Sequence, residues 1–120
     1  MTIGDAARAL GVESHVLRHW DDVGALRPSE RTAAGHRRYT AADLDRGRIA
    51  LRCQRTGMTL ADIAGLGDRD SRRRIVERNL EQLRQQRAQI DRAATFLEHT
   101  LSCTHSIAIE CADCAEFARG

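Results

Sequence analysis

Apolar side chains recur every seven residues through the second half of this chain of 120 residues. A companion row, four residues further on each time, is also apolar except for one arginine. The two rows consist of Val76, Leu83, Ile90 and Leu97, and of Leu80, Arg87, Ala94 and Leu101. This spacing is typical of a coiled coil and predicts a helix over about 70–101, ~48 Å long. Because the preceding residues form too small a domain to cover such a stripe, we expect the helix to pair with a copy of itself.

The first half of the chain carries three Thr-x-x-Asp segments, which begin at Thr2, Thr40 and Thr59. A hydroxyl followed three residues later by a carboxylate marks the start of a helix. Together with glycines that end helices or form tight turns, these signals predict four short helices. The predicted ranges are 3–10, 14–22, 41–56 and 60–66.

A basic segment over 27–39 separates the second predicted helix from the third. It contains the chain's one proline, a glycine suited to a turn, and four arginines. A short β-hairpin fits this composition. The fold class we expect is therefore mainly α: a winged helix-turn-helix domain followed by a long dimerisation helix and a short Cys-rich tail.

Charge and composition narrow the classes of function. The net charge is only +2, but all 19 basic residues are arginines, whose planar guanidinium suits phosphates and guanine edges. One Trp, one Tyr and two Phe are too few for a platform that stacks single-stranded bases. The sequence shows no apolar run of ~18 residues and no secretory leader, so we expect a cytoplasmic protein without a membrane partner. The sequence contains no phosphate-binding loop and no pair of nucleophile and base at a spacing that would indicate an enzyme.

Candidate DNA-contacting residues lie in the second predicted helix and in the hairpin. In a helix-turn-helix the second helix enters the major groove, while a basic wing reaches the flanking phosphates. Trp20 and Tyr39 are expected to pack in the core instead. The candidate contacts are Ser14, His15, Arg18, His19, Arg31, His36, Arg37 and Arg38.

Four segments of the chain resemble motifs of the MerR family of bacterial transcription regulators. Leu17-Arg18-His19-Trp20-Asp21 is similar to Leu-Arg-Tyr-Tyr-Glu of its recognition helix, and Gly24-Ala25-Leu26 to the Gly-Leu-Leu turn that follows. Residues 31–39 resemble the family's wing, and residues 55–63 the start of its fourth helix. The chain departs from the family at His19, Trp20 and His36, which replace tyrosines, and at Glu13, so that Ser14 is expected to cap the recognition helix one residue later.

The resemblance implies a mechanism. Family members are homodimers joined by an antiparallel coiled coil, and they bind promoters whose two polymerase elements lie too far apart. The effector-loaded dimer bends and underwinds this DNA, which brings the elements into line for RNA polymerase, so DNA deformability contributes to specificity.

The tail after the long helix is rich in metal-ligating residues. Cys103, His105, Cys111 and Cys114 offer three thiols and one imidazole within twelve residues. Such a set suits a tetrahedral site for Zn, Cu(I) or Hg, and an iron–sulfur cluster that uses His105 stays open. The gap between Cys103 and Cys111 is similar to the metal loop of copper-sensing family members. Those proteins place a Ser or Cys where the partner's dimer helix begins, whereas this chain has Asp68 there.

These observations predict three parts: a DNA-binding domain over 1–67, a dimerisation helix over 68–101 and an effector tail over 102–120. The leading hypothesis is a dimeric regulator whose tail senses a metal ion or a redox signal. Two alternatives stay open: a regulator of an organic ligand with a structural tail, and an effector-free architectural DNA-binding dimer. Cys53, alone in a predicted helix, is expected to be a small core residue.

Overall fold

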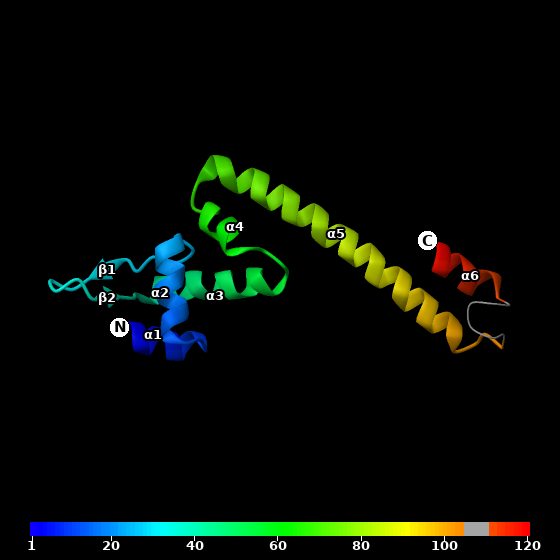
Figure 1. Ribbon diagram of the computed structural model, residues 1–120, viewed down its shortest axis with the longest axis horizontal. Helices are drawn as coiled ribbons and strands as arrows, with labels where there is room; N and C mark the ends of the chain where they lie inside the picture. Colours follow the sequence, from blue (N-terminus) through cyan, green and yellow to red (C-terminus); the bar gives the residue numbers. More distant parts are fainter. Residues whose placement is uncertain (105–110) are drawn as a thin grey trace. The chain divides into compact units, whose positions relative to one another are not determined.

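The computed structural model describes residues 1–104 and 111–120, which form two compact units, Met1–Asn79 and Leu80–Gly120 (Figure 1). Each unit is considered by itself. The first contains four short helices and a two-stranded hairpin, and the second contains a short C-terminal helix. A long helix begins in the first unit and ends in the second. The elements are α1 (Ile3–Leu10), α2 (Ser14–Val23), β1 (Glu30–Arg31), β2 (Arg37–Arg38), α3 (Ala41–Arg55), α4 (Leu60–Gly65), α5 (Arg69–Thr100) and α6 (Ala112–Arg119).

The three Thr-x-x-Asp segments begin α1, α3 and α4, as the sequence predicts. Thr2 and Thr40 each accept a bond from the backbone N–H three residues on, at 3.1 Å, and the aspartate there bonds back to the cap. At Thr59 only the first bond forms, also at 3.1 Å. The Asp62 carboxylate accepts a bond from Asn79 of α5 instead, at 3.3 Å. This third cap therefore also attaches α4 to α5.

The cap of α2 differs from the prediction. Ser14 is the first helical residue, and Glu13, with extended backbone angles of −80° and 152°, occupies the cap position. The Glu13 side chain makes no capping bond within the described residues. Ser14 cannot act as the cap because its backbone already belongs to the first turn. The recognition helix thus begins without the side-chain cap that α1, α3 and α4 have.

The core of the first unit lies where α1, α2, α3 and α4 meet. Trp20 and Tyr39 are fully buried there, as expected of packing residues, and Cys53 packs against the same cluster. Gly11, with a φ of 71°, makes the tight turn that joins α1 to α2. The buried apolar side chains of this cluster are Ala6, Ala7, Leu10, Leu17, Trp20, Leu26, Tyr39, Leu44, Ala50 and Ile63.

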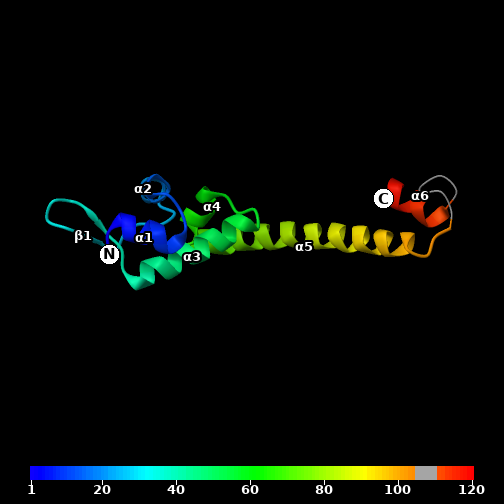
Figure 2. The same ribbon diagram turned by 90° about the horizontal axis from the view of Figure 1, so that it is seen from below.

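The predicted hairpin is present between α2 and α3. Its strands are antiparallel and pair Glu30 with Arg38 and Arg31 with Arg37. Gly35, with a φ of 83°, closes the turn by donating its N–H to the Thr32 carbonyl at 2.8 Å. Figure 2 shows the loop projecting beyond the helices of the first unit. The first unit is therefore a helix-turn-helix with a basic wing.

In the second unit, α6 packs on the end of α5. The rings of Phe96 and Phe117 stack with centroids 4.3 Å apart. At 100° per residue, Phe96 lies about 100–120° around α5 from the heptad residues Ile90 and Leu97, which are 66% and 61% exposed in the single chain. The helix therefore carries two apolar faces, one covered by α6 and one open. None of the helices in the described residues is long and apolar enough to cross a membrane.

Candidate DNA-binding surface and metal centre

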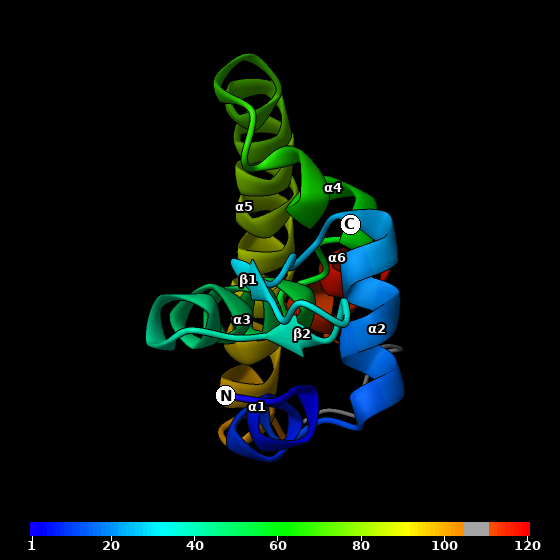
Figure 3. The same ribbon diagram turned by 90° about the vertical axis from the view of Figure 1, so that its left-hand side faces the viewer.

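The recognition helix α2 presents one polar face and buries the other. Leu17 and Trp20 point into the core, whereas His15, Arg18 and His19 are exposed. This division follows from the helical period, because residues three and four apart share a face. Figure 3 shows α2 beside the hairpin. The exposed face of α2 and the wing thus belong to one surface of the first unit.

Arg18 and the wing line the same small cavity. Its volume is about 350 Å³, and it lies where the exposed face of α2 meets the hairpin and the start of α1. The structure therefore brings Arg18 together with three of the predicted wing residues, while Ser14, His15 and His19 lie along α2 outside the cavity. The residues that line it are Thr2, Ile3, Arg18, Thr32, Gly35, His36, Arg37 and Arg38.

A buried carboxylate holds two of the wing arginines. Asp21 of α2 accepts bonds from Arg31 Nη2 at 2.7 Å and from Arg37 Nε at 2.8 Å, both on Oδ2. Burial alone would raise the pKa of Asp21, but the bonds from Arg37 and Arg31 outweigh it and keep that pKa below its ordinary value. The sequence motif contains Asp21, yet nothing in its spacing indicates that two arginines of the wing converge on it. Asp21 fixes the wing against the recognition helix.

A second buried carboxylate fixes the other end of the hairpin. Asp43 accepts bonds from Ser29 N at 3.0 Å, from Ser29 Oγ at 2.6 Å and from Thr40 N at 2.9 Å, and it also pairs with Arg46. Burial opposes ionisation, but these bonds dominate and hold the pKa of Asp43 far below its ordinary value. The aspartate that completes the capping box of α3 therefore also ties down the segment that leads into β1.

The second unit gathers three of the four predicted metal ligands. The donor atoms of Cys103, Cys111 and Cys114, together with His99, all lie within 4.8 Å of one another. Cys111 and Cys114 are buried, and His99 and Cys103 are half-buried. The fourth predicted ligand, His105, lies outside the described residues. Three thiols and one imidazole at this spacing fit the donor set and size of a tetrahedral zinc-type site.

Cys111 sits at the start of α6, where a backbone N–H and an imidazole stabilise its thiolate. The backbone N–H of Cys114, then the imidazole of His99, lower the pKa of Cys111 to about 6. The backbone N–H approaches the sulfur without forming an aligned capping bond, whereas His99 Nε2 lies 3.2 Å from Cys111 Sγ. A thiolate is the form that binds metals and reacts with oxidants, so this site is prepared for either chemistry.

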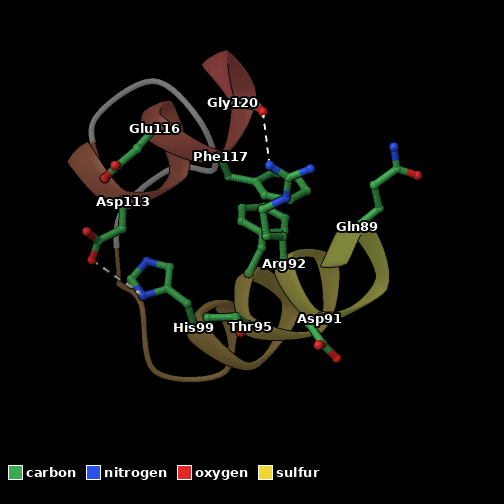
Figure 4. A pocket seen from close by; sticks show the side chains of 10 residues that line it. Gln89, Asp91, Arg92, Thr95, His99, Asp113, Glu116, Phe117 and Gly120 are labelled. Carbon is green, nitrogen blue, oxygen red and sulfur yellow. Dashed lines mark hydrogen bonds and ion pairs between the residues drawn. The ribbon is translucent and has the colours of Figure 1, made fainter. Parts of the chain in front are cut away.

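His99 is the site residue that the sequence analysis missed. It lies in the last turn of α5, four residues before Cys103, whose backbone N–H donates to the His99 carbonyl at 2.9 Å just after the helix ends. Its other ring nitrogen, Nδ1, is 3.9 Å from Asp113 Oδ2 (Figure 4). The heptad pattern places this histidine in the coiled-coil helix, so it was not grouped with the cysteines of the tail.

A larger cavity lies between α5 and α6, next to the thiol cluster. Its volume is about 870 Å³, and His99 and Asp113 line its edge. Figure 4 shows Arg92 reaching across it toward Gly120, whose carbonyl accepts a bond from Arg92 Nη1 at 3.4 Å. The two stacked phenylalanines form part of the wall. This space is large enough for a small organic molecule.

Comparisons with known proteins agree with this architecture. Residues 1–69 match the family model described as MerR HTH family regulatory protein. The mercuric resistance operon regulatory protein of Shigella flexneri is 30% identical over 112 residues, which cover 88% of this chain and 78% of that protein. The transcriptional activator TipA of Streptomyces coelicolor is 46% identical over 67 residues, covering 56% of this chain and 26% of TipA, so the match spans about a quarter of that relative.

Among solved structures, the chain is similar to HiNmlR, a MerR family regulator that lacks the sensor domain and was crystallised with promoter DNA. The TM-score is 0.67 at 29% identity, over 84% of this chain and 86% of that one. These relatives and this fold are those of transcription regulators rather than enzymes. The winged helix-turn-helix, the long helix that follows it and the family match over more than half of the chain lead to one conclusion: the chain belongs to the MerR family of DNA-binding transcription regulators.

Proposed function

We propose that this protein is a dimeric regulator that reads double-stranded promoter DNA with α2 and its wing. In this proposal α2 enters the major groove, with Ser14, His15, Arg18 and His19 toward the bases and flanking phosphates. The wing contacts the adjacent backbone through His36 and Arg38, and through Arg31 and Arg37 on the sides that face away from Asp21. The exposed basic side chains around the smaller cavity support this assignment.

A second copy of the chain covers the open face of α5. Val76, Leu80 and Leu83 continue the row of Ile90 and Leu97, and all are at least a third exposed in the single chain. A helix of 32 residues with an open apolar stripe gains stability by pairing with another such helix. In the proposed dimer the two α5 helices pair antiparallel, so the two DNA-binding units read the two halves of a palindromic site.

The dimer distorts a promoter with an overlong spacer and so aligns it for RNA polymerase, in the cytoplasm where both are found. HiNmlR, which the chain resembles over most of its length, is described as bound to promoter DNA. Bending and underwinding cost energy that depends on the sequence being deformed, so specificity arises partly from base pairs that the protein does not touch.

The observation that carries the sensing role is the cluster of three thiols and one imidazole at the end of the dimerisation helix. A soft or borderline metal ion such as Zn²⁺, Cu(I) or Hg²⁺, or an oxidant that acts on the thiols, is the signal in this proposal. The relative from Shigella flexneri carries mercuric resistance in its name. Because the cluster joins α5 to α6, a change in its chemistry reaches the helix that links the two protomers.

The test is in vitro transcription from the promoter upstream of the protein's own gene, with RNA polymerase and reduced protein prepared without oxygen. We expect transcripts to rise when metal or oxidant is added, and this rise to disappear when Cys111 and Cys114 are replaced by serine. A template whose spacer is shortened should give the same number of transcripts with and without the effector. Transcription that ignores every metal, every oxidant and both replacements would leave an effector-free architectural dimer as the better account.

The larger cavity favours a second candidate function, a response to an organic ligand. The cavity of about 870 Å³ is lined by two phenylalanines and by charged side chains of both signs, Arg92 among them, and it suits a small aromatic compound with polar groups. In this case a compound that activates transcription with the wild type should also activate it with the Cys111→Ser, Cys114→Ser variant. Phe117→Ala should abolish this activation. A compound whose effect survives Phe117→Ala does not act through this cavity.

A further inference from the structure

We infer that a single protomer supplies a complete four-coordinate site for a borderline divalent ion such as Zn²⁺, with His99 of α5 as its nitrogen ligand and Cys103, Cys111 and Cys114 as its sulfur ligands. This deepens the proposed function, on which it rests, because it names the ligands and the metal class of the site in the tail. It also replaces a site confined to the tail with one that is anchored on the dimerisation helix.

The distances fit such a site with little movement. Zinc–sulfur bonds of ~2.3 Å place the donors of a regular tetrahedron ~3.8 Å apart. The four donor atoms already lie within 4.8 Å of one another, and His99 Nε2 is 3.2 Å from Cys111 Sγ. Changes of about one ångström, which small side-chain rotations provide, complete the geometry. The four residues therefore need no rearrangement of the backbone to enclose an ion.

The donor set and its burial decide the class of metal. Thiolates attract soft and borderline ions, and imidazole suits zinc, so a tetrahedral set of three sulfurs and one nitrogen favours Zn²⁺ over two-coordinate Cu(I). Cys114 is 1% exposed and Cys111 is 8% exposed, so water has little access from that side. Four protein donors leave no open position. The site binds and holds an ion, and it performs no reaction on it.

The origin of the ligands gives the ion a mechanical role. His99 comes from the last turn of α5, Cys103 from the segment that follows, and Cys111 and Cys114 from the start of α6. Bonds to one ion therefore tie α6 to α5 at the end where the chain turns back. The stacked rings of Phe96 and Phe117 support the same contact further along the two helices.

Asp113 is a positioning residue for this site. Its carboxylate lies 3.9 Å from His99 Nδ1, on the side of the ring away from the thiols. A small rotation of this carboxylate brings it within hydrogen-bond distance of Nδ1, where it would hold the imidazole with Nε2 directed at the metal, and the loss of such a partner typically lowers metal affinity ~10–100-fold. Asp113 therefore affects affinity without touching the ion.

The experiment uses the full chain, reduced and metal-free, titrated with Zn²⁺ and with Co²⁺ in competition with a chelator. We expect one ion per protomer, an intense visible cobalt spectrum of the tetrahedral type, and an X-ray absorption signal from three sulfurs and one nitrogen. His99→Ala should weaken binding by at least ~100-fold, beyond the effect of Asp113→Asn, which we expect to be nearer ~10-fold. His105→Ala is the matched control and should bind as the wild type does.

Several results would overturn the inference. These are a signal from two sulfurs alone, one ion shared by two chains, a loss of affinity in His105→Ala but not in His99→Ala, or cysteines that pair as disulfides under the same reducing conditions. The measurement is independent of DNA. Tight binding through His99 in a protein whose transcription ignores zinc would leave this inference standing and refute zinc as the signal. Transcription that responds to zinc in a protein that binds it equally well after His99→Ala would overturn this inference and leave the sensing role standing.

Discussion

The buried pairing of Asp21 with two wing arginines makes a sharp prediction about Asp21→Asn. The substitution keeps the size of the side chain and one oxygen acceptor, but it removes the charge that Arg31 and Arg37 share at 2.7 and 2.8 Å. The two guanidinium groups then face a neutral amide. We expect the first unit to lose stability because the wing is no longer fixed against α2.

The size of the loss follows from burial. A hydrogen bond to a charged group contributes ~1.5–3 kcal/mol, and two fully buried ones would contribute more. Here the side chain of Asp21 is 8% exposed, but those of Arg37 and Arg31 are 25% and 47% exposed, so water compensates part of the loss. We therefore expect the free energy of unfolding to fall by ~2 kcal/mol, roughly a thirtyfold change in the unfolding equilibrium.

Urea unfolding at neutral pH and fixed protomer concentration measures this loss. Trp20 is the chain's one tryptophan and is 2% exposed, so its fluorescence reports the unfolding of this core. Asp22→Asn is the matched control. Asp22 is the next residue and faces the same Arg37, but its side chain is 72% exposed and the contact is 4.0 Å, so we expect a change within ~0.5 kcal/mol.

The pH dependence gives a second check on the same reasoning. The pKa of Asp21 is lower in the folded protein than its ordinary value of about 4. Its carboxylate therefore stabilises the fold fully above that value, and the stabilisation is lost as the pH falls through the folded pKa. The difference between wild type and Asp21→Asn should shrink in acid. An equal loss in Asp22→Asn, or a difference that does not change with pH, would refute the argument.

Three further predictions concern DNA, assembly and the tail. Arg18→Ala should weaken operator binding by ~1–3 kcal/mol in a fluorescence anisotropy titration; Arg73→Ala removes the same charge from a side chain that is 84% exposed on α5, and equal losses would mean that only net charge matters. Ile90→Asp should make the protein monomeric at micromolar concentration in sedimentation equilibrium, because a buried carboxylate costs several kcal/mol. Gln85→Asp, on the opposite face of α5, should leave the dimer intact. Phe117→Ala should speed hydrogen exchange in α6, since it removes the ring stacked at 4.3 Å on α5, and unchanged protection would mean that the stack does not hold α6.

Most of the fold could be predicted because its signals are local. A hydroxyl and a carboxylate three residues apart, such as Thr40 and Asp43, set a helix start through bonds within one turn. The wing was equally predictable from its composition. The start of α2 was not, since Glu13 occupies the cap position without a capping bond and Ser14 lies one residue inside the helix.

The site was harder to predict because its parts are close only in the folded chain. Helix α6 has eight residues and begins after Cys111, which gives no conventional capping signal, so no helix was predicted in the tail. His99 was assigned to the coiled coil, and its distance of four residues from Cys103 acquired meaning only when α6 folded back. The same holds for Asp21, whose two arginine partners come from different strands.

In the proposed regulator, one apolar face of α5 holds the sensing tail and a separate apolar face pairs with the second protomer. Phe96 and His99 lie on one face of the helix, and Ile90 and Leu97 on another. A substitution on the tail side would therefore change the signal of the proposed regulator and leave its proposed dimer interface unchanged. Related regulators in one cell can in this way diverge in what they detect without losing self-recognition, and two different tails can be compared on one unchanged dimer.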